Sequence, residues 1–224
     1  AYFWPFAKKD PLNNVKKTLE GMYNEYVHLN DKDWRWAPVI LSKFKVEKFN
    51  HSLIQDWRFK YIRASFKIKN KSLQVDVFHP YPNTTEREKS SFLKGILKEK
   101  RQLHILAGDL IALSPEDTYE KQKLITGYKT FMKDNGEQKV EDMLKGLTIK
   151  TILDHGLIDT YKERNKKMRY TMPTDLRSKN KDSSTRIDYI FCSKDIKVIK
   201  SGIIKNKLAE VVSDHYPIFS VLEV

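Results

Sequence analysis

Three aspartates and two histidines lie beside runs of β-forming residues, and these residue types suit chemistry on a phosphate. They are Asp109, Asp188, Asp214, His79 and His215. Carboxylates can bind a hard cation such as Mg²⁺, which prefers oxygen ligands, and histidines can hydrogen-bond a phosphate or move a proton. Taken singly, Asp109 could cap a turn and His215 could be a structural histidine. Because every one of them lies next to a predicted strand, together they predict one cleft for a metal ion and a phosphate.

The segment from residue 73 to residue 109 explains how two of these side chains would meet. A strand over 73–79 ends at His79, and a capping box formed by Thr85 and Glu88 begins an amphipathic helix. A second strand over 103–107 ends at Gly108-Asp109. A strand–helix–strand crossover joins two roughly parallel strands of one sheet. His79 and Asp109 are therefore expected at the same sheet edge, where α/β folds bind ligands.

The other expected elements follow from hydrophobic period and from turn signals. Asn70-Lys71 is expected to form the turn of a hairpin. The stretch 45–58 is expected to be a connection, and the polar stretch 162–184 a long surface loop. The remaining elements are helices over 11–24, from Ser114 to about 135 and over 137–146, a packed turn at 151–159, and strands over 39–42, 61–68, 186–192, 197–205 and 216–223.

The composition indicates one globular domain over residues 1–224, because 40% of the residues are hydrophobic. No apolar run approaches the roughly 20 residues that a membrane helix needs, and no signal peptide is visible. These observations leave the compartment open. Cys192 is the only cysteine and is expected to be a buried, inert thiol. The formal net charge of +13 suits a polyanionic partner, although a lysine-rich surface could also serve solubility alone.

Four motifs, in order along the chain, resemble the endonuclease/exonuclease/phosphatase superfamily, also called DNase I-like. They are Val77-Phe78-His79, Ala107-Gly108-Asp109, Arg186-Ile187-Asp188-Tyr189-Ile190 and Ser213-Asp214-His215-Tyr216-Pro217. The resemblance implies an α/β fold, a four-layer sandwich of two packed mixed sheets flanked by helices. It also implies hydrolysis of phosphoester bonds that depends on Mg²⁺ or Mn²⁺.

The resemblance also implies a role for each residue of the predicted cleft. His79 would hydrogen-bond the scissile phosphate, and Asp109 would orient or deprotonate the attacking water. Asp188 would pair with His215 and set its tautomer. His215 would contact the phosphate and stabilise the charge that develops there. Asp214, together with Asp109, would hold the metal ion, which would act as a Lewis acid.

The sequence departs from the family pattern at two places. The Gly-Asp-Phe-Asn motif of the family is Gly108-Asp109-Leu110-Ile111 here, so Ile111 occupies the position of an amide that positions phosphate and nucleophile. Losing one such donor commonly costs on the order of a hundredfold in rate. The family's first two strands, the second of which ends in a Gln-Glu pair with the main metal ligand, have no counterpart, so the domain is expected to be N-terminally incomplete. A complementing N-terminal segment is therefore an expected partner.

The substrate is less strongly indicated than the fold. The basic composition and the loop aromatics suit nucleic acid, since lysines hold phosphates and aromatic rings stack on bases. Arg58, Tyr81, Arg177 and Lys181 are the predicted substrate contacts. One alternative is a hydrolase of phospholipids or small phosphoesters, because this fold carries several activities. Another is a non-catalytic module that binds polyanions. DNA or RNA, and endo- or exonucleolytic cleavage, stay open.

Overall fold

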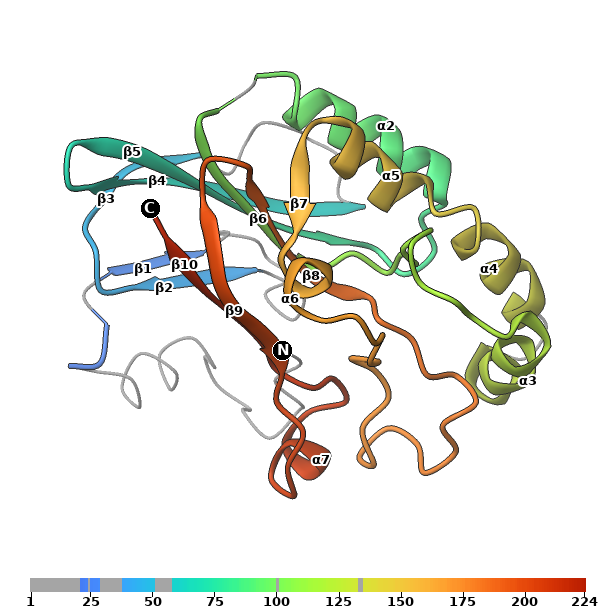
Figure 1. Cartoon of the computed structure of the whole chain (residues 1–224). Coiled ribbons are helices and arrows are strands. Elements are labelled where there is room, and N and C mark those ends of the chain that lie inside the picture. Colours follow the sequence, from blue (N-terminus) through green and yellow to red (C-terminus); the bar gives the residue numbers. More distant parts are fainter. Residues whose placement is uncertain (1–20, 24, 29–37, 51–57, 100, 133–134) are drawn as a thin grey trace.

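A six-stranded mixed sheet forms the centre of the molecule (Figure 1). The structure is a computed structural model, and it describes residues 21–23, 25–28, 38–50, 58–99, 101–132 and 135–224. Neighbouring strands of the sheet are antiparallel except β5 and β6, which are parallel. In spatial order the strands are β3 (Val46–Asn50), β4 (Phe59–Ile68), β5 (Lys71–Pro80), β6 (Leu103–Asp109), β8 (Asp188–Ser193) and β7 (Leu157–Asp159).

The predicted crossover is confirmed. Helix α2 (Glu86–Ile96) joins β5 to β6, and its capping box uses Thr85 and Glu88 as expected. The hairpin between β4 and β5 is also confirmed, but its turn is Lys69-Asn70, one residue earlier than predicted. Lys69 adopts a φ of 56° there. The parallel pairing of β5 with β6 brings His79 and Asp109 to one edge of the sheet.

Helices cover one face of this sheet. Side chains of β4, β5, β6 and β8 that point to this face pack against α2 and α5 (Leu147–Asp154) in one buried apolar cluster. The alternation of side chains along a strand separates this face from the opposite one. Within the cluster, the Phe78 and Phe92 rings stack with centroids 5.0 Å apart. The helix-covered face of the sheet next to the candidate residues is therefore packed with buried aromatic and aliphatic side chains.

A strand pair covers the other face. β9 (Lys197–Ile203) and β10 (Ile218–Glu223) form an antiparallel sheet whose Val198 and Leu222 pack against β5, β6, β7 and β8. β1 (Glu25–His28) and β2 (Val39–Ser42) form a second two-stranded sheet. Within the described residues, three of the four expected layers are present: the helices, the main sheet and the small sheets. The predicted α/β class is confirmed. Among these residues, no helix is long and apolar enough to cross a membrane.

The remaining helices lie at one end of the main sheet. α3 (Lys121–Met132) and α4 (Gly136–Met143) pack around Leu113, Met172 and Ile187. Two short helices, α6 (Thr160–Arg164) and α7 (Ala209–Val212), precede the closing strands. Cys192 is buried, and burial raises the pKa of its thiol to about 11, in agreement with an inert cysteine.

Several sequence predictions were wrong. The stretch expected to connect strands contains β3, an edge strand. The segment Ser114–Asp117 is a turn closed by Asp117 N–H and Ser114 O, and α3 begins only at Lys121. The packed turn expected at 151–159 contains the last part of α5 and all of β7. Most of the helix expected over 11–24 lies outside the described residues, and its residues 21–23 precede β1 and are not helical.

The predicted surface loop is only partly on the surface. Its first residues, up to Arg164, belong to α6, and Thr171, Met172 and Thr174 are buried. Polar residues can be buried when their side chains are hydrogen-bonded, and an apolar period is therefore absent from this part of the sequence. The part of the loop around Thr171 packs inward toward β8, while most of its other residues are exposed or half-buried.

Gly108 allows β6 to approach β5 immediately before Asp109. Its φ is +147°, and an added Cβ would lie 2.0 Å from the backbone oxygen of Phe78. We expect Gly108→Ala to lower the free energy of unfolding by about 3 kcal/mol, since strained backbone and a backbone clash combine. Urea unfolding measures this loss. Gly95→Ala is the matched control, because a Cβ on Gly95 meets open space and alanine favours a helix interior. Equal stabilities of the two variants would contradict the prediction.

Candidate active site

The ends of two neighbouring strands place Asp109 and Asp188 opposite each other. Asp109 is the last residue of β6, Asp188 is the first of β8, and the two are partners in the antiparallel register. His79, near the end of β5, lies on the other side of Asp109, with 3.7 Å between His79 Nε2 and Asp109 Oδ2. Three residues far apart in the sequence therefore meet at one sheet edge, as predicted.

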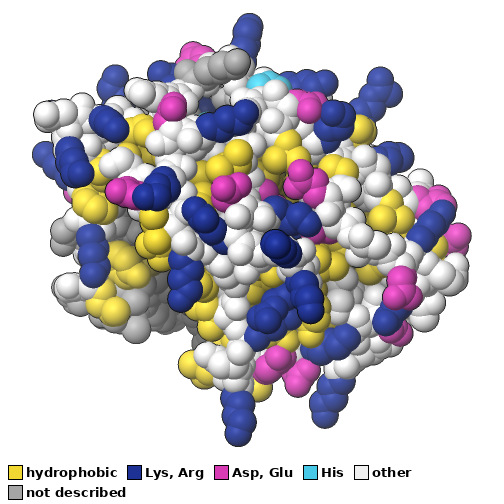
Figure 2. All heavy atoms as spheres, viewed as in Figure 1, with side chains coloured by type: hydrophobic (Ala, Val, Ile, Leu, Met, Phe, Trp, Pro, Cys, Tyr) yellow, Lys and Arg dark blue, Asp and Glu magenta, His cyan; other side chains and the backbone are white. Residues whose placement is uncertain are grey.

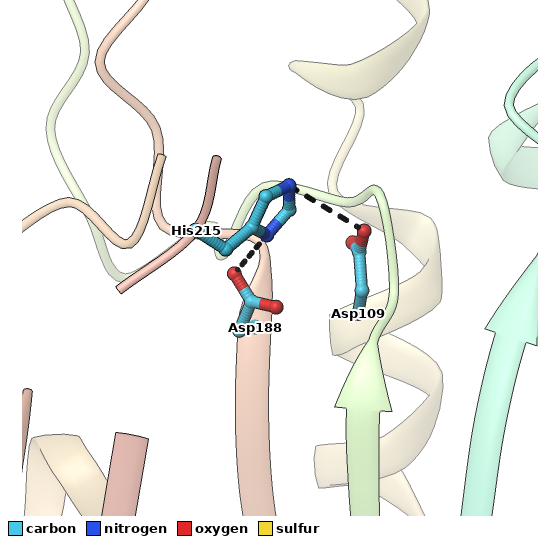
Figure 3. Close-up of side chains that lie close together, drawn as sticks. All are labelled: Asp109, Asp188 and His215. Atoms are coloured by element: carbon cyan, nitrogen blue, oxygen red, sulfur yellow. Dashed lines mark hydrogen bonds and ion pairs between the residues drawn. The ribbon is translucent and has the colours of Figure 1, made fainter. Parts of the chain in front are cut away.

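His215 enters the same site from the segment between α7 and β10. Its Nδ1 lies 2.8 Å from Asp188 Oδ2, and its Nε2 lies 4.0 Å from Asp109 Oδ2. Figure 3 shows the imidazole ring between the two carboxylates, with one nitrogen directed at each. The predicted hydrogen bond between Asp188 and His215 is confirmed. Because Asp188 engages Nδ1, the Nε2 edge of the ring is the one that can face a substrate.

Burial and neighbouring charges shift the pKa values of His215, Asp109 and His79 in different directions. Burial alone would lower the pKa of His215, but the charge and hydrogen bond of Asp188 outweigh it and raise that pKa to about 9. Burial and the charge of Asp188 raise the pKa of Asp109. Burial lowers the pKa of His79. At neutral pH the site therefore holds an imidazolium at His215 and a neutral imidazole at His79, while the pKa of the Asp109 carboxyl is raised.

Thr171 supports Asp188 and was missed by sequence reasoning. Its Oγ1 accepts the backbone N–H groups of Ile187 at 3.1 Å and Asp188 at 3.3 Å. Burial would raise the pKa of Asp188, but His215 and the hydroxyl of Thr171 lower it by more. Thr171 belongs to the segment predicted to be a surface loop, so no sequence signal marked it.

A buried cation fixes the chain just before Asp188. The Arg186 guanidinium donates to Asp117 Oδ2 at 2.8 Å and to Asp159 Oδ2 at 2.6 Å, and its side chain is 1% exposed. The same group lies over the Tyr189 ring, 4.5 Å from its centroid. Arg186 thus ties the start of β8 to the 114–117 turn and to the N-terminus of α6. The Arg-Ile-Asp-Tyr motif marked Arg186, but neither acidic partner could be named from the sequence.

The turn after β6 bends around Ile111. Ile111 adopts a φ of +46°, and its N–H donates to Asp109 Oδ1 at 2.9 Å. A β-branched residue in this left-handed region costs about 1–3 kcal/mol. The backbone of Ile111 therefore serves the Asp109 carboxylate, whereas its side chain offers no hydrogen bond.

The donor set suits a hard cation only in part. Asp109, Asp188 and His215 each offer a ligand atom, and these atoms lie within 4.8 Å of one another. An imidazolium has no lone pair, however, and Asp188 is hydrogen-bonded to it, so His215 and Asp188 are engaged with each other. Asp214 Oδ1 is buried and has no hydrogen-bond partner among the described residues. Within the cluster, Asp109 is therefore the carboxylate that best suits Mg²⁺, which commonly uses one or two carboxylates together with water and phosphate oxygens. The cluster does not include Asp214, the other predicted ligand.

Two predicted substrate contacts, Arg58 and Tyr81, lie together beside the end of β5. The Tyr81 N–H donates to Arg58 O at 2.6 Å, and the Tyr81 side chain is exposed. The Arg58 guanidinium forms an ion pair with Glu88, the residue that also completes the capping box of α2. Arg58 is thus tied to the start of α2, and Tyr81 presents a ring to solvent near His79.

The other two predicted contacts lie on the loop before β8. Arg177 Nη1 is 3.9 Å from Asp214 Oδ2, and the Arg177 side chain is 41% exposed. Lys181 Nζ donates to Pro173 O and Ser178 O, both at 3.1 Å, and pairs with Asp175 at 2.8 Å. Arg177 is therefore placed at the rim of the site, while Lys181 holds its own loop in shape. Three aromatic residues in or near predicted loops, Trp34, Trp36 and Trp57, lie outside the described residues.

Comparison with solved structures identifies the fold. A 3′ phosphatase named NExo from Neisseria, bound to a product DNA hairpin, matches with a TM-score of 0.63 and 17% identity over 97% of this chain and 86% of the other. TDP2 from D. rerio, complexed with a single-strand DNA product, matches with a TM-score of 0.59 and 17% identity over 96% and 83%. The chain has the endonuclease/exonuclease/phosphatase fold. A third match, an endonuclease/exonuclease/phosphatase from Beutenbergia cavernae, reaches a TM-score of 0.67 with 14% identity, over 96% of this chain and 58% of the other.

The endonuclease/exonuclease/phosphatase fold was predicted from the four motifs, and it is confirmed. Neither protein-family models nor the sequences of curated proteins gave a match. At sequence identities of 14–17%, these matches show likeness of fold and not of activity. The activity of this chain therefore has to be argued from its own residues.

Proposed function

We propose that this chain is a metal-dependent phosphodiesterase that hydrolyses nucleic-acid phosphodiester bonds. The observation that carries the proposal is the hydrogen-bonded pair of Asp188 and His215 facing Asp109, with His79 on the far side. These residues place a cation, a neutral hydrogen-bond donor and a carboxylate around one point. Such a set of groups can promote the attack of water on a phosphodiester. The solved structures of the same fold include a phosphatase and a complex with a DNA product, which is consistent with this choice.

Each residue has a distinct role in the proposed reaction. Asp109 orients the attacking water or accepts a proton from it. The His215 imidazolium stabilises the negative charge that develops on the phosphate oxygens, and Asp188 keeps it protonated. His79, neutral at physiological pH, hydrogen-bonds a non-bridging oxygen. The charges that His215 and His79 need for these roles are already present before the substrate binds.

Asp109 and Asp214 would hold the metal ion. When bound, Mg²⁺ or Mn²⁺ supplies Lewis-acid stabilisation of the phosphate. Asp214 contributes a buried oxygen with no hydrogen-bond partner among the described residues, and an unpaired buried oxygen is costly unless a ligand satisfies it. Arg177 lies close enough to Asp214 to approach the same phosphate.

Nucleic acid is favoured as substrate by the charge of the chain. Figure 2 shows Lys and Arg side chains distributed over the visible face rather than collected in one band. We expect DNA binding to weaken about a thousandfold between 50 and 200 mM salt, as for roughly six phosphate contacts. Fluorescence anisotropy with a labelled oligonucleotide measures this slope. A dissociation constant that does not change with salt would contradict binding through the positive field.

One observation favours a phospholipid substrate as the second candidate. Four aliphatic side chains beside the site are more than half exposed: Leu176, Leu208, Val211 and Val212. The Leu176 N–H donates to Glu210 O, which places the loop against α7, and Asp214 lies two residues after the end of α7. Exposed aliphatic groups next to basic residues also suit the surface of an anionic bilayer.

A substrate panel tests the proposal. The chain is incubated at neutral pH with Mg²⁺ or Mn²⁺ and with single-stranded DNA, duplex DNA, RNA or anionic phospholipid vesicles. We expect cleavage of nucleic acid that stops when EDTA is added and that His215→Ala abolishes. Hydrolysis of lipid headgroups without cleavage of nucleic acid would support the second candidate. Salt-sensitive DNA binding without hydrolysis of any substrate would indicate a non-catalytic binding module.

A further inference from the structure

A buried ion pair of α2 lies directly behind the turn that follows Asp109. Lys89 and Glu86 have side chains that are 0% exposed, and Lys89 Nζ is 2.5 Å from Glu86 Oε1. The same ammonium group contacts Ile111 O at 2.5 Å and Leu110 O at 3.4 Å. An ammonium group has three N–H donors. Two of them are directed at backbone carbonyls of the turn, and Glu86 balances the charge of the group as an ion pair.

The pair is itself fixed by the helices around it. Glu86 Oε2 accepts the N–H of Thr148 at the start of α5, at 2.8 Å, and the Glu86 N–H donates to Asp142 Oδ2 on α4 at 2.7 Å. A lysine anchored in this way has little freedom to follow a moving turn. Its position therefore determines where the carbonyls of Leu110 and Ile111 can lie.

The turn needs such an anchor because of the residue at position 111. Isoleucine is disfavoured at positive φ, and yet this conformation directs the Ile111 N–H at Asp109 Oδ1. Neighbouring parts of the turn are held by β8 and the residue before it: the Leu110 N–H donates to Ile187 O, and the Tyr189 hydroxyl donates to Ala112 O. The carbonyl of Ile111 is held by Lys89.

We propose that Lys89 is a positioning residue that holds Ile111 in its left-handed conformation and so aims the Ile111 amide at Asp109. Lys89 lies behind the turn and acts on the carboxylate only through the backbone. The inference rests on the proposed function for its effect on hydrolysis. Its effect on the Ile111 amide holds whether or not the chain is an enzyme.

Amide hydrogen exchange tests the proposal without any activity. The variant Glu86→Gln/Lys89→Met removes both buried charges together, which avoids leaving one unpaired. We expect the amide of residue 111 to exchange at least about tenfold faster, while amides in the middle of β6 keep their rates. Lys139→Met is the matched control, since Lys139 Nζ donates to Pro82 O and Thr84 O instead. An unchanged rate at residue 111, or an equal acceleration in the control, would overturn the proposal.

Replacing Ile111 separates positioning from general support of the fold. Glycine adopts positive φ without strain, so in an Ile111→Gly background the loss of the ion pair should matter little. If hydrolysis is detected, we expect the Glu86→Gln/Lys89→Met change to lower kcat about tenfold in the parent, with KM little changed, and less than about twofold in the Ile111→Gly background. Equal losses in both backgrounds would show a structural role only. If the parent variant does not fold, recovery of folding by Ile111→Gly supports the proposal, and failure in both backgrounds overturns it.

Discussion

Asp188→Asn is expected to lower phosphodiester hydrolysis by about 10³- to 10⁴-fold at neutral pH, the scale seen when a carboxylate behind a catalytic histidine is neutralised. The variant keeps the size of the side chain but removes its charge. Burial, which opposes protonation of His215, then acts without the Asp188 charge that outweighs it. The imidazolium that stabilises the transition state is lost. KM should change little, because the group acts on charge that develops in the reaction.

The pKa of His215 gives a second measurement of the same prediction. Histidine ring signals in NMR should titrate near 9 in the parent and well below that value in Asp188→Asn. A raised folded-state pKa contributes stability that is complete below the ordinary value of 6.5 and is lost as the pH rises through about 9. The stability difference between parent and variant should therefore shrink above this pH. Asp195→Asn, on an exposed turn after β8, is the matched control. A His215 titration that is unchanged in Asp188→Asn would contradict the assignment.

Ile111→Asn is expected to raise hydrolysis about a hundredfold, because it supplies a side-chain donor where the present residue supplies none. The change should also stabilise the fold by about 1 kcal/mol, since asparagine tolerates the left-handed conformation better than isoleucine. Steady-state kinetics on the preferred substrate and urea unfolding measure the two effects separately.

Ile111→Gly separates the two causes of that gain. Glycine relieves the backbone strain but adds no hydrogen-bonding group, so its kcat should stay near that of the parent while its stability changes. Equal gains in kcat for asparagine and glycine would show that relief of strain, rather than the missing amide, limits the reaction. No gain from either variant would favour the non-catalytic module.

Local patterns predicted the elements whose signals lie within a few residues. The capping box at Thr85 and Glu88, the alternation along β5 and the crossover to β6 depend on neighbouring side chains and on general rules of connection. β3 was missed because an edge strand carries charged residues such as Glu47 and Lys48. α5 was missed because its β-branched residues, Ile149 and Ile152 among them, resemble a strand until they are packed against α2.

The sequence by itself determined the fold and the core of the candidate site. The site residues belong to motifs beside strand ends, and the ends of neighbouring strands lie at one edge of the sheet once it has formed. These residues are His79, Asp109, Asp188 and His215. Only the tertiary structure decided the support of the site: Thr171 behind Asp188, the acidic partners of Arg186, and Lys89 behind Ile111. These contacts join residues up to 69 positions apart. Their effect depends on burial and on distance, because a hydrogen bond or a pKa shift is strong only where water is excluded, and a linear sequence contains neither quantity.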